Sequence, residues 1–447
     1  MTEIKKKEQK LMHLITYGCQ MNEHDSEKLA GVLEDEGYQS TEKLEDADII
    51  ILNTCCVREN AELKVYGKVG QLKSLKRENP DLIIGICGCM MQQEDVVKEI
   101  KEKYRHVDIV FGTHNIHHFP KLLREAKEDK NPLVKVWEES KELIPEMPVQ
   151  RKDDHKAFVT IIYGCDNFCT YCIVPHVRGR EKSRPLENIV NEIENLVADG
   201  VKEVTLLGQN VNSYGKDFEE EIDFADLLTE VDQIEGLARI RYMTSHPRDF
   251  SDKLVETISG LDKVCNHFHL PVQAGSNKIL KKMNRNYTKE EYLRLVEKIR
   301  MNNPDAAITT DVIVGFPGES EDDFEKTLDL FKEVEFDMAY SFLYSKRTGT
   351  PAAEYEEQIS EKVKKERLQR LMDIQSDISL EKNKPLEGRV VEVLVEGESK
   401  KDPNKLTGRT CSNKIVIFES NRDLTGELIN VKINRVQSWT LFGDLVR

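Results

Sequence analysis

The chain has 447 residues, of which 39% are hydrophobic and 33% charged, and its formal net charge is -16. At about 100–200 residues per domain, this length predicts two to four domains. No stretch approaches the ~18 consecutive apolar residues of a membrane span, and the basic segment MTEIKKKEQKL lacks the apolar core of a secretory signal. We therefore expect a cytoplasmic protein without a membrane-bound part. The acidic balance argues against a general nucleic-acid coating protein, but it allows one basic face on an acidic body.

The N-terminal segment alternates apolar runs with amphipathic stretches. Strands are expected at residues 13–17, 48–53, 82–87 and 107–112, and helices at 26–36, 60–76 and 93–104. This alternation predicts a parallel α/β sheet whose loops meet at the carboxyl edge of the strands. We expect this domain to span residues 10–126 and to be followed by a charged, proline-containing linker at 127–150.

A second β/α series follows the linker. Its expected strands are 158–163, 203–208, 239–244, 267–271, 308–314 and 339–344, and its expected helices are 185–198, 224–234, 252–259, 289–302 and 321–334. Six units without a clear seventh and eighth predict an open, partial (β/α)6 barrel over 151–382. A charged helix is expected at its end, over 360–382. The short runs GRVVEVLVEG, KIVIFE and LINVKINRV then predict a small all-β barrel over 384–447.

The motif YGCDNFCTYC places Cys165, Cys169 and Cys172 at the spacing C-x3-C-x2-C. Three thiolates on one loop can bind three irons of a cubane cluster and leave the fourth iron open to a ligand, which suits catalysis. The alternative is a zinc site, for which His176 is available as a fourth ligand.

A second set of cysteines falls at or just past three strand ends of the N-terminal sheet: Cys19, Cys55 and Cys89. One such cysteine alone is more often a buried core thiol. Three in equivalent loops of a parallel sheet predict a second three-thiolate site, because those loops converge in space.

The remaining four cysteines receive no metal role from the sequence. Cys56 is an unassigned neighbour of Cys55, and Cys87 lies within an apolar strand, so we expect it in the core. Cys265 and Cys411 stand alone in the sequence and are expected to be structural.

The cysteine loop after the first barrel strand, with Tyr171 before its last cysteine, resembles the radical S-adenosylmethionine superfamily. Over essentially the whole chain, the sequence resembles the methylthiotransferase family within it. Further matching stretches are LLGQNVNSYG, TSHP, HLPVQAGS, MNRNYT, TDVIVGFPGE and TGTPA. The resemblance implies an N-terminal domain with an auxiliary [4Fe-4S] cluster, a radical S-adenosylmethionine core with a second [4Fe-4S] cluster, and a C-terminal RNA-binding TRAM domain. It assigns the first cluster to Cys19, Cys55 and Cys89 and the second to Cys165, Cys169 and Cys172.

Within the family, GCQMNEHDSE and FCTYCIVPHVRGRE resemble the branch that methylthiolates carbon 2 of N6-isopentenyladenosine beside the tRNA anticodon. The resemblance implies a radical reaction that consumes two S-adenosylmethionine molecules for each 2-methylthio-N6-isopentenyladenosine. Sister branches act on threonylcarbamoyladenosine in tRNA or on a ribosomal-protein aspartate, and tend to carry GCKVN or GCPKN at the first cysteine. Ala274 and Asn286 depart from the usual pattern of the branch. A rival of another class is a zinc-stabilised RNA-binding module without catalysis.

Polar and glycine residues at the carboxyl ends of the barrel strands are expected to contact S-adenosylmethionine. Together with Tyr171 they are Gln209, Asn210, Ser245, His246, Gln273 and Gly315. Each of the polar ones could equally make a loop or capping hydrogen bond.

A basic segment directly after the cluster loop is expected to contact RNA phosphates. Its cations are Arg178, Arg180, Lys182 and Arg184. The expected partners are a tRNA whose anticodon loop carries isopentenyladenosine and an external electron donor such as flavodoxin or ferredoxin, and a monomer suffices. In the small β-barrel, Phe418 and Trp439 are expected in the core rather than at RNA.

Overall fold

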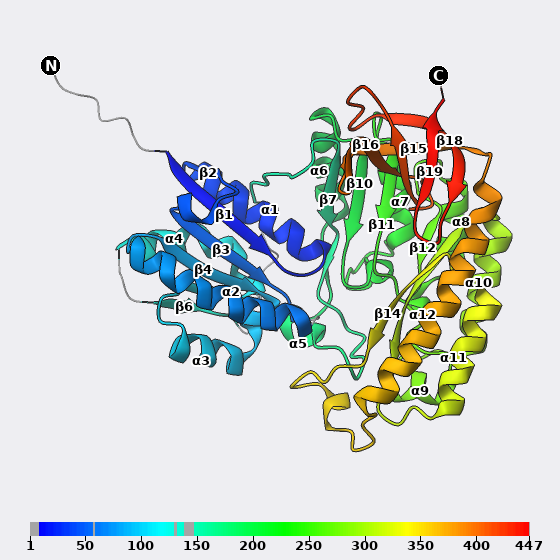
Figure 1. Ribbon diagram of the computed structural model, residues 1–447, viewed down its shortest axis with the longest axis horizontal. Helices are drawn as coiled ribbons and strands as arrows, with labels where there is room; N and C mark the ends of the chain where they lie inside the picture. Colours follow the sequence, from blue (N-terminus) through cyan, green and yellow to red (C-terminus); the bar gives the residue numbers. More distant parts are fainter. Residues whose placement is uncertain (1–8, 57–58, 129–131, 138–146, 447) are drawn as a thin grey trace. The chain divides into compact units, whose positions relative to one another are not determined.

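The computed structural model describes residues 9–56, 59–128, 132–137 and 147–446 (Figure 1). The chain divides into two compact units. The first comprises Met1–Lys152, Tyr163–Asp166 and Ile173–Lys182, and the second comprises Asp153–Ile162, Asn167–Cys172 and Ser183–Arg447. The segments on either side of Asn167–Cys172 therefore pack with the first unit.

The first unit is built on a parallel six-stranded sheet of order β2-β1-β3-β4-β5-β6. Its strands are β1 (Lys10–Thr16), β2 (Tyr38–Ser40), β3 (Ile49–Thr54), β4 (Ile83–Gly88), β5 (Ile109–Phe111) and β6 (Leu133–Lys135). Its helices are α1 (Gln20–Asp35), α2 (Glu59–Glu78), α3 (Glu94–Lys103), α4 (Phe119–Glu128) and α5 (Val174–Arg178).

Helices cover both faces of this sheet, as an apolar run such as that of β3 requires. Ile49 and Ile51 join the core that includes α1 and α4, whereas Ile50 and Leu52 join the core that includes α2 and α3. The alternation of side chains along β3 thus feeds two separate hydrophobic layers.

The four predicted strands and three predicted helices of this unit are present, but the sequence missed β2, β6, α4 and α5. Both missed strands are three-residue edge strands, too short for a period-2 pattern to be legible. Within the expected linker 127–150, Leu133–Lys135 pairs with β5 as β6, and residues 129–131 and 138–146 lie outside the described residues.

The second unit contains six parallel strands in two three-stranded sheets, β11-β10-β7 and β12-β13-β14. The strands are β7 (Lys156–Thr160), β10 (Glu203–Leu207), β11 (Arg239–Tyr242), β12 (His267–His269), β13 (Ala307–Val314) and β14 (Met338–Leu343). A parallel bridge between Ile240 and Val264 brings the chain that leads into β12 alongside β11. The predicted partial (β/α)6 barrel is confirmed.

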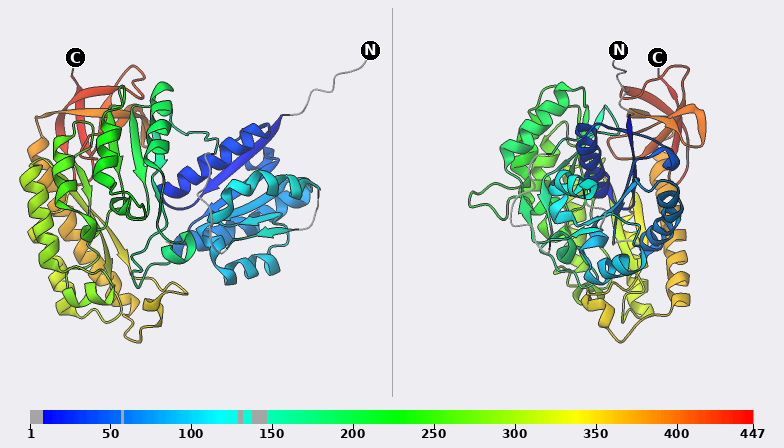
Figure 2. Two further views of the ribbon diagram at one scale, coloured as in Figure 1. Left: turned by 180° about the vertical axis from the view of Figure 1, so that it is seen from behind. Right: turned by 90° about the vertical axis from the view of Figure 1, so that its left-hand side faces the viewer.

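Helices alternate with these strands and cover the outer face of the strand layer (Figures 1 and 2). They are α6 (Leu186–Ala198), α7 (Phe224–Asp232), α8 (Asp252–Gly260), α9 (Asn277–Lys282), α10 (Lys289–Asn302), α11 (Glu321–Val334) and α12 (Glu361–Asn383). A two-stranded pair, β8 (Ile162–Tyr163) and β9 (Lys182–Ser183), brackets the cysteine motif. No helix in the described part of the chain combines the length and the apolarity needed to cross a membrane.

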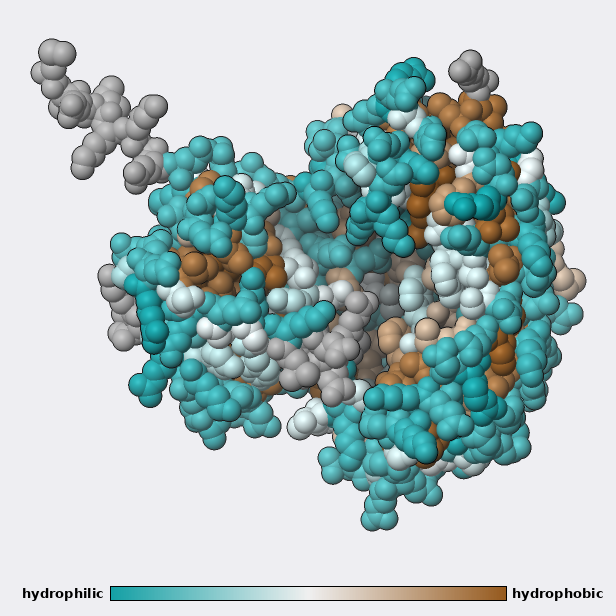
Figure 3. Space-filling view, viewed as in Figure 1, coloured by the Kyte–Doolittle hydropathy of each residue, from teal (hydrophilic) through white to brown (hydrophobic). Residues whose placement is uncertain are grey.

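The C-terminal part of the second unit is a closed five-stranded barrel of order β15-β16-β17-β19-β18. Its strands are β15 (Val390–Ser399), β16 (Asp402–Arg409), β17 (Ile415–Glu419), β18 (Leu428–Val436) and β19 (Leu441–Leu445). Phe418 is buried in its core, as predicted, but the prediction for Trp439 is wrong, because this side chain lies in the turn before β19 and is 49% exposed. Figure 3 shows apolar residues reaching the surface of this barrel.

Candidate cluster and cofactor sites

Three cysteines lie at one edge of the first unit's sheet. Cys19 follows β1 and caps α1, Cys55 follows β3, and Cys89 opens a 3-10 turn directly after β4. Because β1, β3 and β4 are neighbours and parallel, their carboxyl ends share an edge. All ten cysteines lie in the described part of the chain, and none is in a disulfide.

Asn22 and Gly18 draw the three loops together. The Asn22 Oδ1 atom accepts hydrogen bonds from the thiols of Cys19, at 3.6 Å, and Cys89, at 4.0 Å. Gly18 has φ +140°, and a Cβ there would lie 2.8 Å from the Cys55 Cβ. A side chain at position 18 would therefore displace Cys55.

A buried arginine, which the sequence placed at RNA, completes this edge. The Arg178 Nε atom donates to the Cys89 sulfur at 3.1 Å, and Nη2 donates to Asn22 Oδ1 at 3.1 Å and to the Asp25 carboxylate at 2.9 Å. Only 7% of the Arg178 side chain is exposed. A positive charge is thus fixed against a cysteine sulfur, with a carboxylate on its other side.

Cys56, left unassigned by the sequence, also belongs to this edge. A hydrogen bond from the Cys56 thiol, helped by the Arg178 guanidinium, lowers the pKa of the Cys89 thiol to about 6, although burial opposes the shift. The same hydrogen bond and burial raise the pKa of Cys56. Cys87 is buried within β4 and packs in the core, as expected.

These observations fit a [4Fe-4S] cluster held by Cys19, Cys55 and Cys89. The donors are thiols, one of them is biased towards the thiolate, and a guanidinium donates a hydrogen bond to a cysteine sulfur. Among the described residues, no three Cys, His, Asp or Glu side chains gather at the spacing that holds a single metal ion. In a cubane each thiolate binds a different iron, so the thiols need not meet at one ion.

The C-x3-C-x2-C loop is tied down by backbone hydrogen bonds in each unit. In the first unit, the Cys165 N–H donates to the Gly179 carbonyl at 3.1 Å. In the second, the Cys172 N–H donates to the Cys169 carbonyl at 2.9 Å, and the Thr170 N–H donates to the Met283 carbonyl at 3.1 Å. These bonds fix the backbone at Cys165 in the first unit and at Cys169 and Cys172 in the second. Three cysteines on one loop after the first barrel strand fit a cluster with one open iron.

Arg285 is a site residue that the sequence analysis missed. Its Nη1 atom donates to the Cys169 sulfur at 3.4 Å, Nη2 to the Pro271 carbonyl at 2.8 Å, and Nε to the Tyr287 hydroxyl at 3.2 Å. The side chain is buried, and its guanidinium lies over the Tyr287 ring. The signal was an arginine inside the stretch MNRNYT, whose target in the fold the sequence does not reveal.

Three of the predicted cofactor residues present buried polar atoms without a hydrogen-bond partner among the described residues. These atoms are Asn210 Oδ1, Ser245 Oγ and His246 Nε2, which follow β10 and β11. The His246 ring lies 5.6 Å from the Tyr287 ring, which places it near Arg285. Burial and the Arg285 charge lower the pKa of His246 to about 2, so its imidazole is neutral at physiological pH. Buried atoms in this state suit a polar ligand.

The other predicted cofactor residues have different surroundings. Gln273 is buried with φ +69°, and its backbone N–H donates to the Asp311 carbonyl. Gly315 has φ +74°, and a Cβ there would lie 2.4 Å from Lys364 Cγ. Tyr171 packs edge-on against Phe316, and Gln209 is half-buried. Their contacts with the cofactor stay predictions.

Two of the four cations predicted to contact RNA are buried and paired within the protein, and the RNA contact of all four stays a prediction. Arg178 is paired inside the first unit, as described above. Arg184 is buried, donates to the Thr160 carbonyl at 2.7 Å and pairs with Glu192 at 2.7 Å. By contrast, the Arg180 side chain is 70% exposed beside Asp166, and Lys182 is half-buried.

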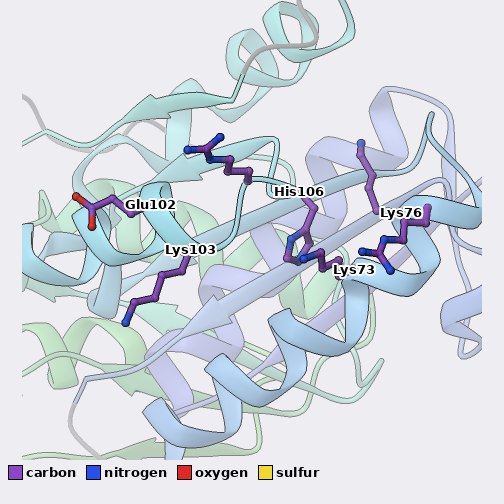
Figure 4. A pocket seen from close by; sticks show the side chains of 7 residues that line it. Lys73, Lys76, Glu102, Lys103 and His106 are labelled. Atoms are coloured by element: carbon purple, nitrogen blue, oxygen red, sulfur yellow. The ribbon is translucent and has the colours of Figure 1, made fainter.

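A basic hollow lies elsewhere on the first unit, between α2 and α3. Its lining residues are Lys73, Lys76, Arg77, Glu102, Lys103, Arg105 and His106 (Figure 4). Lys76 hydrogen-bonds to the Leu82 carbonyl and the Asp108 carboxylate, which precede β4 and β5. The hollow is therefore at the amino edge of the sheet, opposite the cysteines, and we do not assign it to the cluster site.

Comparisons with known proteins agree with this geometry. The Radical SAM superfamily matches residues 159–331, the TRAM domain matches 384–446, and a family described as "Uncharacterized protein family UPF0004" matches 11–112. The chain is 60% identical over 434 residues to the tRNA-2-methylthio-N(6)-dimethylallyladenosine synthase of Thermoanaerobacter pseudethanolicus, covering 97% of this chain and 92% of that protein. It is 57% identical to the protein of the same name from Acetivibrio thermocellus, covering 100% and 93%.

The chain belongs to this synthase family. Solved structures at 14% and 13% identity share its fold. They are the radical S-adenosylmethionine methyltransferase TsrM from Kitasatospora setae, with a TM-score of 0.56 over 77% of this chain and 75% of that one, and the cobalamin-dependent radical enzyme OxsB, with a TM-score of 0.52 over 83% and 56%. Membership of the synthase family favours iron–sulfur clusters over the zinc alternative at both cysteine sets.

Proposed function

We propose that this protein is a tRNA methylthiotransferase that converts N6-isopentenyladenosine beside the anticodon into 2-methylthio-N6-isopentenyladenosine. The observation that carries the proposal is the pairing, in one chain, of two three-cysteine sets. One lies at the edge of a parallel sheet with a buried arginine on Cys89. The other lies on the loop after the first strand of the partial (β/α)6 barrel, with a buried arginine on Cys169. We call this barrel, from β7 to α12, the half-barrel. The synthase relatives, matched over nearly their full length, support the substrate.

When bound, the two [4Fe-4S] clusters and S-adenosylmethionine supply one-electron cleavage of the sulfonium, activation of an inert C–H bond and a source of sulfur. The protein's residues bind and orient these groups. Cys165, Cys169 and Cys172 would hold the cluster that binds S-adenosylmethionine, and the set at the sheet edge would hold the auxiliary cluster.

Two arginines also place a positive charge and a hydrogen-bond donor beside a cysteine sulfur. Arg178 donates to Cys89 and Arg285 donates to Cys169, and each fixes its sulfur by a charge-assisted contact. The neutral imidazole of His246 and the unpartnered Asn210 and Ser245 atoms supply acceptors and donors for the polar groups of S-adenosylmethionine.

RNA contact rests on exposed cations and aromatic faces. Arg180 is exposed on the first unit, and Lys182 follows it in the chain. On the C-terminal barrel, Trp439 is exposed and the Arg435 guanidinium lies 3.9 Å from the centre of the Phe442 ring. Stacking on such groups binds single-stranded bases without a duplex groove. We assign the domains as 10–126 for the auxiliary cluster, 151–382 for the radical core and 384–447 for RNA.

We propose that the protein acts on tRNA in the cytoplasm, where a flavodoxin or ferredoxin would deliver electrons. Each chain carries both cysteine sets and the RNA-binding barrel, so a monomer suffices.

The test uses anaerobically reconstituted protein and anticodon stem-loops that carry either isopentenyladenosine or threonylcarbamoyladenosine. We expect a methylthio group on the first substrate only, with two S-adenosylmethionine molecules consumed for each product. Methylthiolation of the second substrate alone would overturn the assignment of the substrate and keep the reaction type. Reaction with neither substrate, in protein that holds iron and sulfide, would overturn the tRNA assignment.

A further inference from the structure

Two cysteines that are far apart in the sequence lie side by side in the second unit. Cys265 lies between α8 and β12 of the half-barrel, and Cys411 follows β16 of the C-terminal barrel. The two thiols are close enough for each to shift the pKa of the other. Cys265 is 1% exposed and Cys411 is half-buried. Neither belongs to a cluster set, and the sequence analysis treated each as isolated.

Hydrogen bonds to the backbone of both cysteines hold them in place. The Cys265 N–H donates to the Ile240 carbonyl at 2.9 Å. Arg241 Nη1 donates to the Cys411 carbonyl at 3.2 Å, and Nη2 donates to the Thr410 carbonyl at 2.8 Å. The Cys411 sulfur also accepts the backbone N–H of Asn266, which follows Cys265. Cys265 is therefore held by the half-barrel, and Cys411 is held beside it by Arg241, which also belongs to the half-barrel.

The surroundings shift the pKa values of the two thiols in opposite directions. The hydrogen bond from Cys265, with the Asn266 amide and the guanidinium groups of Arg241 and Arg239, lowers the pKa of the Cys411 thiol to about 6, although burial opposes it. The same hydrogen bond and burial raise the pKa of Cys265. Cys411 is therefore the more acidic and the more accessible thiol of the two, and Cys265 is its buried neighbour. This combination is typical of a redox-reactive cysteine with a resolving partner.

We propose that Cys411 and Cys265 form a redox-active pair that a small-molecule disulfide such as glutathione disulfide oxidises to a bridge between the half-barrel and the C-terminal barrel. The Cys411 thiolate attacks one sulfur of the small disulfide, forms a mixed disulfide and releases one thiolate. Cys265 loses its proton and attacks the Cys411 sulfur, which releases the second thiolate. Two protein thiols become one disulfide, and the small disulfide gains two electrons and two protons to become two thiols.

The bridge would join surfaces that otherwise meet through polar contacts. Arg239 pairs with Glu392 at 2.8 Å, and Lys156 pairs with Glu396 at 3.0 Å. In each pair one residue lies on the half-barrel and the other on the C-terminal barrel. A disulfide here fixes the proposed RNA-binding barrel to the catalytic unit until a thiol reductant opens it. This inference does not rest on the proposed reaction, because it concerns thiols outside both cluster sets.

The test maps disulfides in the anaerobic holoenzyme after incubation with glutathione disulfide. Remaining thiols are alkylated and the protein is digested with trypsin. Trypsin releases Cys265 in VCNHFHLPVQAGSNK and Cys411 in TCSNK, so the bridge appears as one linked peptide. We expect this linked peptide to become the dominant form of both cysteines and to disappear after treatment with dithiothreitol. The buried Cys87 is the internal control. We expect it to stay out of any disulfide and to be alkylated only once the protein is unfolded.

Two variants separate the roles of the cysteines. Cys265→Ser should trap glutathione on Cys411, because the resolving thiol is gone. Cys411→Ser should leave Cys265 without glutathione, because the attacking thiolate is gone. Absence of the linked peptide in the wild-type holoenzyme, or glutathione that remains on Cys411 there, would overturn the proposal. The wild-type result stands alone if a variant fails to fold.

Discussion

The two cysteine sets of this protein each meet one buried arginine, but the arginines are balanced differently. Arg178 touches the Cys89 sulfur and also pairs with the Asp25 carboxylate at 2.9 Å. Arg285 touches the Cys169 sulfur and also donates to the Pro271 carbonyl and the Tyr287 hydroxyl. The first arginine is held in an ion pair, whereas the second is held by neutral groups.

This difference suggests distinct tasks for the two environments. An ion pair contributes little net charge, so Arg178 orders the auxiliary site more than it changes its potential. A guanidinium among neutral groups keeps its charge, which favours the reduced form of a nearby cluster and an anionic ligand group. We therefore expect the auxiliary site to be organised for geometry and the site of the cysteine loop for electron uptake.

The largest expected effects come from removing one cysteine of each set. Cys169→Ala should abolish cleavage of S-adenosylmethionine and product formation, and Cys89→Ala should abolish the methylthio product while reductive cleavage continues. Iron content should fall by about half in each variant, because one of two clusters is lost. The measurements are iron analysis and quantification of 5′-deoxyadenosine and modified nucleoside. Equal loss of cleavage in both variants would erase the distinction between the sets.

The next largest effect is expected for Arg178→Ala. Removing the arginine leaves Asp25 buried without its partner, which should cost about 3–5 kcal/mol of unfolding free energy and reduce auxiliary-cluster occupancy. The matched control is Arg180→Ala, because this side chain is 70% exposed and its loss should change stability by less than about 0.5 kcal/mol. Chemical denaturation and iron content report both quantities. An Arg178→Ala protein as stable and as iron-rich as the control would refute the ordering role.

Arg285 should mainly change the reduction potential of the cluster held by the cysteine loop. Arg285→Gln removes a positive charge beside Cys169, so we expect the reduction potential of that cluster to fall and the rate of S-adenosylmethionine cleavage with it. Arg285→Lys keeps the charge and should recover part of the potential. Asp25→Asn is the counterpart at the other site and should raise the auxiliary potential, because the charge of Arg178 is no longer offset. Redox titration followed by electron paramagnetic resonance measures all three. No shift in Arg285→Gln would contradict the electrostatic account.

The smallest effect concerns pH. Burial and the Arg285 charge hold the pKa of His246 at about 2, below its ordinary value, so the ring gains a proton only in strong acid. The unfolded chain takes up this proton near about pH 6.5, so His246 lowers the free energy of unfolding progressively as the pH falls below that value. In the folded chain the ring stays neutral between about pH 6 and pH 8. The KM for S-adenosylmethionine should therefore show no inflection from this histidine in that window. An inflection near about pH 6.5 that vanishes in His246→Asn would show that the ring titrates normally.

The sequence was sufficient where a short local pattern decides the outcome. The C-x3-C-x2-C spacing is contiguous, and Cys19, Cys55 and Cys89 each follow an apolar run whose carboxyl end defines the same sheet edge. The six strands of the half-barrel could be predicted for the same reason, because each is an apolar run flanked by segments with helical periodicity.

Contacts between residues far apart in the sequence could not be predicted. Arg178 was interpreted as an RNA contact from the local charge of its segment, but its partner Asp25 lies 153 positions away. Arg285 reaches Cys169 across 116 positions, and no spacing rule connects them. Trp439 was expected in a core because it is large and apolar, yet it falls in a turn that the small barrel leaves exposed. Partnership across the fold is a tertiary property that composition and periodicity do not encode.

The most direct test of the central claim is nucleoside mass spectrometry of tRNA from a host that lacks its own enzyme for this modification. The host would express the wild-type chain or its Cys169→Ala variant. The account predicts 2-methylthio-N6-isopentenyladenosine with the wild-type chain and unmodified isopentenyladenosine with the variant. Isopentenyladenosine left unmodified by a wild-type protein that contains its full complement of iron would contradict it.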